Sequence, residues 1–178
     1  TIHAPVSGTV TAVDLQPNGQ GVRQMMITIK REGDEWVPEV DLTPDLVREC
    51  TLEPKEILDR IKAAGIVGMG GATFPTHVKL SVPPGKKAEF LIINGVECEP
   101  YLTSDHRTML EKGEELMVGT TILMRALGVK QAQIGIENNK PDAIAFLREL
   151  SKHYEGVRVT PLKVRYPQGG EKQLIAAV

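Results

Sequence analysis

Segments with helical periodicity alternate with short apolar runs over most of this chain, and that alternation restricts the fold more than any other feature. Helical spacing covers residues 53–64, 105–127 and 141–150, and strand-like runs cover 90–93, 129–137 and 157–162. Units of about 30 residues are typical of strand–helix–strand repeats. The pattern therefore predicts an α/β fold with a mainly parallel, Rossmann-like sheet and helices on both faces.

Ligands of such sheets bind outside the carboxyl ends of the strands. The loops after Ile93 and Leu162 should both open at that edge. The helical pattern from Asp105 to Leu127 predicts one long helix, which Gly128 ends. Gly113 and Gly119 lie inside this helix, and we expect close packing against a neighbour to explain them.

The first 45 residues have a different pattern. Short β-type runs flank Asn18 and Gly19, a pair that favours a hairpin. The opening APVSGTV resembles the first strand of biotinyl and lipoyl carrier domains. We therefore expect a small β unit of barrel-sandwich hybrid type and a connector over residues 1–45, and an α/β domain over 46–178. The last residues, EKQLIAAV, form a helical pattern without a stop signal, so we expect the second domain to be truncated.

Composition excludes several classes of function. The net charge of −2 and the pI near 6.1 give no basic surface for nucleic acid. No apolar run reaches the roughly 18–20 residues that cross a bilayer, so direct membrane insertion is not expected. Cys50 and Cys98 form no CxxC motif, and His77 and His106 have no second ligand at helical spacing. No metal site is predicted within this segment.

The segment GIVGMGGATFPTHVKL, residues 65–80, is the first candidate binding element. Gly68, Gly70 and Gly71 remove side chains where the backbone must bend or approach a ligand closely. Successive backbone N–H groups in such a loop can bind an anion, and Lys79 is a flexible cation that follows shortly after. A glycine-rich surface turn is the alternative interpretation.

Two further loops have an unusual composition, NGVECEP at residues 94–100 and YPQGGEK at 166–172. If they meet the glycine loop at one sheet edge, they form a pocket with an anion-binding floor, acidic walls and aromatic faces. A flat, polar, phosphorylated heterocycle suits such a pocket, and its carboxylates favour NADH over NADPH. The residues expected to line it are Asn94, Glu97, Glu99, Gly170 and Glu171, with Phe74 and Tyr166 as the aromatic faces.

Three ordered segments carry a resemblance to a known family: GIVGMGGATFPTHVKL, LIINGVECEPYLTSDHRTML and YPQGGEKQLI. They resemble the C subunits of Rnf electron-transport complexes, which are related to the FMN- and NADH-binding subunit of respiratory complex I. The resemblance covers about the whole chain. Val96 stands where the complex I subunit has an aspartate, so one polar contact of that family is absent.

The resemblance implies roles for individual residues. Gly68, Gly70 and Gly71 would hold FMN, and Lys79 would lie near its phosphate or ribityl chain. Phe74 would pack on the NADH adenine. Asn94, Glu97 and Glu99 would line the flavin and the nicotinamide, and the two glutamates are the expected catalytic residues. Gly170 and Glu171 would close the pocket.

The resemblance also implies a function for the complete protein, a NADH-dependent flavoprotein oxidoreductase. Hydride would pass between NAD(H) and FMN, and electrons would then reach 4Fe–4S clusters that lie outside this segment. The protein would be peripheral, on the cytoplasmic side of the membrane, with the other subunits of the complex as partners. The segment alone is expected to be inactive. A corrinoid reductase of a microcompartment and a non-catalytic docking module remain alternatives.

Overall fold

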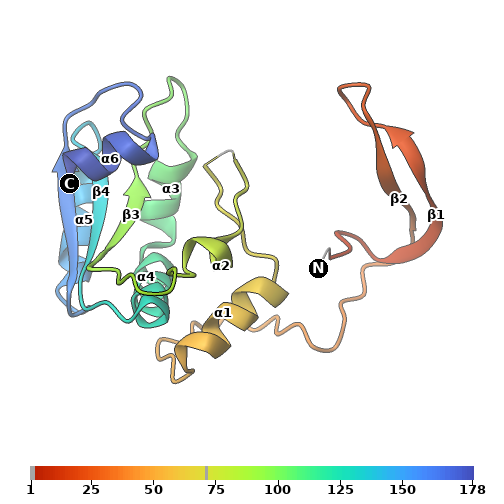
Figure 1. Cartoon of the computed structure of the whole chain (residues 1–178), viewed down its shortest axis with the longest axis horizontal. Helices are drawn as coiled ribbons and strands as arrows, with labels where there is room; N and C mark the ends of the chain where they lie inside the picture. The colour runs from red at the N-terminus through yellow and green to blue at the C-terminus, as the bar shows by residue number, and fades with distance from the viewer. Residues whose placement is uncertain (1–2, 71) are drawn as a thin grey trace. The chain divides into compact units, whose positions relative to one another are not determined.

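A computed structural model describes residues 3–70 and 72–178 of the chain (Figure 1). The chain divides into two units, Thr1–Asp45 and Leu46–Val178. Among the residues described, no helix combines the length and apolar character needed to cross a membrane.

The first unit is built on a β-hairpin. Strands β1 (Gly8–Pro17) and β2 (Arg23–Arg31) pair antiparallel, which confirms the hairpin predicted at Asn18. The Asn18 side-chain oxygen accepts hydrogen bonds from the backbone N–H groups of Gln20 (2.9 Å) and Val22 (3.0 Å), so this side chain organises the turn.

One face of the hairpin is apolar and exposed. The register places Val13 opposite Ile27 and Leu15 opposite Met25, and all four side chains are exposed. A two-stranded hairpin has little stability of its own in water. Its assignment as half of a barrel-sandwich domain stays a prediction.

The second unit contains a parallel sheet in the order β3-β4-β5. Its strands are β3 (Leu91–Gly95), β4 (Ala132–Glu137) and β5 (Val157–Leu162), paired in parallel throughout. The predicted parallel α/β sheet is therefore confirmed. The central strand β4 is the most buried, because helices cover it on both sides.

The two faces of the sheet have different covers (Figure 1). Helices α3 (Ser104–Glu111), α4 (Gly113–Leu127) and α5 (Pro141–Ser151) bury Met117, Ile134 and Leu147 on one face. On the other face, Leu174 of α6 (Glu171–Ala177) packs with Val96 and Leu162. The expectation of helices on both faces is thus confirmed.

The prediction of a single long helix from Asp105 to Leu127 is wrong. The backbone breaks at Lys112, whose φ of −127° and ψ of 32° are not helical, so α3 and α4 are separate. A Cβ on Gly113 would lie 2.5 Å from Phe146 and 2.8 Å from Leu150, so α5 approaches the break closely. Apart from the backbone of its own helix, no described residue has a heavy atom within 4 Å of a Cβ built on Gly119, so close packing explains only Gly113.

Helix α1 (Pro54–Ala63) leads the chain into the glycine loop. Glu53 and Glu56 form a capping box at its start, and Pro54 occupies the first turn. Ile57 and Ile61 pack with Leu80, which directly follows the short helix α2 (Thr76–Lys79). The two ends of the glycine loop are therefore fixed on the same small apolar cluster.

Substitutions at the two glycines of α4 should have opposite effects on stability. Gly113→Ala should lower the free energy of unfolding by about 1–3 kcal/mol, because the new methyl group overlaps Phe146. Gly119→Ala should raise it by about 0.5–1 kcal/mol, because alanine stabilises a helix interior where space is open. Thermal unfolding followed by circular dichroism measures both, and equal effects would contradict the packing described.

Candidate functional site

The glycine loop is a short hairpin-like excursion between α1 and α2. Val67 and Pro75 form a β-bridge, and the Gly68 N–H donates to the Phe74 carbonyl at 2.9 Å. The Thr76 N–H donates to the Ile66 carbonyl at 3.1 Å and closes the base. Gly71, one of the expected FMN-binding residues, lies outside the described residues.

Lys79 lies directly against this loop. A Cβ built on Gly68 would be 2.5 Å from the Lys79 Nζ, so the ammonium group occupies space that only a glycine leaves open. Among the described residues other than its chain neighbours, none places a heavy atom within 4 Å of a Cβ built on Gly70, so space there is open. An exposed ammonium group beside accessible backbone can bind an anion such as a phosphate.

The loops after β3 and β5 meet at the carboxyl edge of the sheet. The Asn94 side-chain amide donates to the Gly169 carbonyl at 2.9 Å, and its oxygen accepts the Val96 N–H at 3.1 Å. The Gly169 N–H donates to the Cys98 sulfur at 3.3 Å. The expectation that both loops open at one edge is confirmed.

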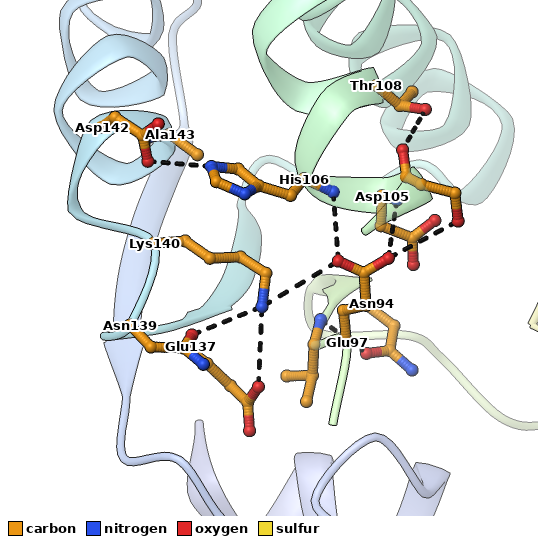
Figure 2. A network of polar contacts seen from close by, with 12 residues as sticks. Asn94, Glu97, Asp105, His106, Thr108, Glu137, Asn139, Lys140, Asp142 and Ala143 are labelled. Carbon is orange, nitrogen blue, oxygen red and sulfur yellow. Dashed lines mark hydrogen bonds and ion pairs between the residues drawn. The ribbon is translucent and has the colours of Figure 1, made fainter. Parts of the chain in front are cut away.

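Glu97 is buried and caps helix α3 (Figure 2). One carboxylate oxygen accepts the Asp105 N–H at 2.9 Å, and the other accepts the His106 N–H at 3.3 Å. These are N–H groups that the first turn of a helix leaves without a backbone acceptor. The carboxylate expected to face a ligand is thus engaged by the protein, whereas Glu99 is exposed.

Lys140 lies between two buried carboxylates in Figure 2. Its Nζ is 4.0 Å from Glu97 Oε2 and 3.7 Å from Glu137 Oε2, and it donates to the Asn139 side-chain oxygen at 3.3 Å. The other Glu137 oxygen accepts the Arg165 N–H at 3.3 Å. The ends of β3 and β4, the start of α3 and the loop after β5 are joined by this network.

Two titrating groups lie beside the network. His106 Nε2 is 2.8 Å from an Asp142 oxygen, and this hydrogen bond, followed by one from the Ala143 N–H, lowers the pKa of Asp142. Partial desolvation of the carboxyl group, and then the nearby charge of Glu97, raise the pKa of Asp105, although its side chain remains solvent-exposed and Lys140 acts in the opposite direction.

A cavity of about 390 Å³ opens beside these groups. Its lining includes Glu97, Glu99, Tyr101, His106, Glu137 and Lys140. Carboxylates outnumber the cations, so the cavity suits hydroxyl, amide or ring N–H donors better than a phosphate. Its volume lies within the range of small-molecule sites. The residues described contain no group of three or more His, Cys, Asp or Glu placed to bind a metal.

The expected site residues fall into two groups. Gly68, Gly70, Phe74 and Lys79 lie on the glycine loop and α2. Asn94, Glu97, Glu99, Gly170 and Glu171 lie at the sheet edge, with Gly170 as the cap of α6. In the described part of the chain, no hydrogen bond joins the two groups. Their joint role in one pocket stays a prediction.

Sequence reasoning missed Glu137 and Lys140. Both lie in the polar run ENNK that directly follows the apolar part of strand β4. A charged pair at the carboxyl end of a central parallel strand is a signal that the sequence did contain.

The part of the chain that contains these residues matches a known protein family. Residues 61–178 match the family model of the Nuo51 FMN-binding domain. The chain belongs to the Nuo51 FMN-binding domain family. Every expected site residue from Gly68 to Glu171 lies within the matched region.

Relatives of this family member include components of ion-translocating complexes. The C subunit of the Na⁺-translocating ferredoxin:NAD⁺ oxidoreductase complex of Acetobacterium woodii is 44% identical over 99% of this chain. The C subunit of the proton-translocating ferredoxin:NAD⁺ oxidoreductase complex of Clostridium ljungdahlii is 46% identical over 98% of it. The chain spans 40% and 37% of the lengths of these relatives.

The fold of this Nuo51-type domain also occurs in solved structures. An air-oxidised NAD⁺-reducing NiFe-hydrogenase matches with a TM-score of 0.60 and 26% identity, over 69% of this chain and 23% of that one. The H₂-reduced form of such a hydrogenase matches with a TM-score of 0.55 and 25% identity, over 69% and 24%.

Removal of the Glu97 carboxylate should destabilise the protein. Glu97→Ala leaves the α3 N–H groups and the buried Lys140 without this partner, and should lower the free energy of unfolding by about 3–5 kcal/mol. Glu99→Ala is the matched control, because Glu99 is exposed and should tolerate the change. Urea unfolding measures both, and an equally small effect at Glu97 would contradict its role as a cap.

Asp105 should make stability depend on pH. Because its pKa is raised in the folded state, stability falls as pH rises from the ordinary aspartate pKa of about 4 through the raised value. Asp105→Asn should therefore be more stable than the wild type at neutral pH, and the two should converge below about pH 4. Melting temperatures of both proteins between pH 3 and 8 test this. A stability difference in favour of Asp105→Asn that increases as the pH falls would contradict the prediction.

Proposed function

We propose that this chain is the FMN- and NAD(H)-binding part of a NADH-linked flavoprotein of the Rnf type. The complete protein would be a peripheral subunit on the cytoplasmic side of an ion-translocating membrane complex, with the other subunits as partners. The observation that carries this proposal is the match of residues 61–178 to the Nuo51 FMN-binding domain, which contains all of the candidate site residues.

Features of the glycine loop fit a flavin phosphate. The Lys79 ammonium lies over Gly68, in a space that a Cβ would fill, and Gly70 leaves open space on the same loop. Backbone N–H groups and one flexible cation supply the charge that a phosphate dianion requires. Lys79 and the loop glycines would therefore hold FMN by its phosphate and ribityl end.

The acidic cavity at the sheet edge fits the donor-bearing parts of a nucleotide. Glu99 is exposed there, Lys140 contributes an ammonium group, and His106 contributes an imidazole ring. Exposed Glu99 is free to accept hydrogen bonds from ribose hydroxyls or a carboxamide, whereas Glu97 would act by positioning the loop, since α3 and Lys140 engage it. Phe74, 48% exposed, would offer its ring to the adenine.

FMN held by these residues would supply the chemistry of hydride exchange with NAD(H) and of electron transfer to 4Fe–4S clusters outside this segment. The residues of this chain would hold both nucleotides and orient their rings. Asn94 and Cys98 contribute by fixing Gly169, so that the loops after β3 and β5 keep one shape at the pocket.

The complete protein should be purified with bound flavin. Its visible absorption spectrum should show flavin bands that bleach when NADH is added. Lys79→Ala should weaken FMN binding by about ten- to a hundredfold, because an ion-paired hydrogen bond to the phosphate is lost. Titration of the apoprotein with FMN, followed by flavin fluorescence, measures this.

Gly68→Ala tests the same loop by steric means. The new methyl group must displace the Lys79 ammonium, a flexible group, so FMN affinity should fall while the melting temperature of the apoprotein is kept. Lys62→Ala removes an exposed lysine in the last turn of α1. It is the control for the loss of charge in Lys79→Ala and should leave FMN affinity unchanged. Complete protein that contains no flavin and binds none on titration would contradict the proposed function.

A further inference from the structure

The segment Glu99–Leu102 forms a tight turn whose sequence conflicts with its geometry. The Leu102 N–H donates to the Glu99 carbonyl at 3.3 Å, Pro100 occupies the second position, and Tyr101 the third. The φ of Tyr101 is +69°, the left-handed value that a type II turn needs at this position. Glycine or asparagine normally occupies it, because a β-carbon is strained there.

The tyrosine ring obtains no packing in compensation for this strain. Its side chain is fully exposed, at 102% of the reference value. Among the residues that the structure describes, only Thr73 shares a positive φ without being a glycine, and Thr73 lies on the glycine loop. Strained positions of this kind concentrate at binding sites, where the strain holds a side chain ready for a ligand.

Tyr101 lies at the cavity of about 390 Å³, together with Glu99, His106 and Lys140. An aromatic ring therefore stands in water next to a polar cavity whose carboxylates outnumber its cations. Lys140 is the cation at its inner end, and Glu97 and Glu137 flank its ammonium group. The cavity should therefore exclude a phosphate and accept a ring that carries hydrogen-bond donors.

We propose that Tyr101 is a stacking platform for a planar nitrogen heterocycle of the nucleotide ligand. This inference rests on the proposed function and names the residue that receives one of the nucleotide's rings. The exposed π-face supplies the contact, and Glu99, the first residue of the same turn, can accept a hydrogen bond from the ring's exocyclic amide or amine. Stacking of this kind changes affinity by about tenfold or more for each ring.

Substitutions at Tyr101 separate stacking from a role in the turn. Tyr101→Gly and Tyr101→Asn remove the ring but suit the left-handed conformation, so the melting temperature should stay equal or rise by about 2–4 °C. Tyr101→Phe keeps the ring and the strain. If the ring binds the ligand, the first two variants should bind NAD⁺ about tenfold more weakly, and Tyr101→Phe should bind it like the wild type.

The measurements are calorimetric titrations of the complete, FMN-loaded protein, with melting curves of each variant. Titrations with NAD⁺, nicotinamide mononucleotide and AMP distinguish the two rings, because only the fragment that stacks on Tyr101 should lose affinity in Tyr101→Gly. Trp36→Ala, which removes an exposed aromatic ring from the first unit, is the control and should leave all affinities unchanged.

Each outcome decides the inference. Weaker binding by Tyr101→Gly and Tyr101→Asn with recovery in Tyr101→Phe supports stacking. The inference is overturned if all three variants bind NAD⁺ as tightly as the wild type does, or if only Tyr101→Phe binds it more weakly. A wild-type protein that carries FMN but binds no pyridine nucleotide overturns it as well, whereas absence of FMN contradicts the proposed function itself. The two failures are therefore distinguishable.

Discussion

The buried ammonium group of Lys140 is the interaction on which the candidate site depends. Glu97 and Glu137 approach it from the ends of neighbouring parallel strands, at 4.0 and 3.7 Å. Charges buried this deeply are tolerated only when they are paired and hydrogen-bonded. The same two carboxylates also accept N–H groups from the start of α3 and from Arg165. These ion pairs and hydrogen bonds therefore fix the carboxyl edge of the sheet, where Glu99 and Tyr101 are exposed.

Local sequence patterns predicted the scaffold well. The apolar run 157–162 is the strand β5 with the same bounds, and the prolines at 54 and 141 begin α1 and α5 as first-turn prolines do. These features were accessible because side-chain periodicity and the missing N–H of proline act within a few residues. The parallel order then followed from the alternation of strands and helices.

What the sequence could not provide are contacts between distant segments. The break at Lys112 accompanies the close approach of Phe146 and Leu150 to Gly113, which no local pattern encodes. Glu97 was expected to face a ligand, and only the folded chain shows that α3 and Lys140 engage its carboxylate. Glu99 and Lys79 were expected to be accessible to a ligand, and both are exposed in the structure.

The remaining conflicts between local rules and structure gather at the candidate site. Tyr101 and Thr73 are non-glycine residues with positive φ, and they lie on the two loops expected to bind nucleotide. Glu137 Oε2 is a buried oxygen without a hydrogen bond in the described part of the chain, and its residue lines the cavity. A fold selected for stability alone would place glycine at residue 101 and an apolar side chain at 137. That Tyr101 and Glu137 share one edge with the Lys140 network argues that binding, rather than packing, determined the residues there.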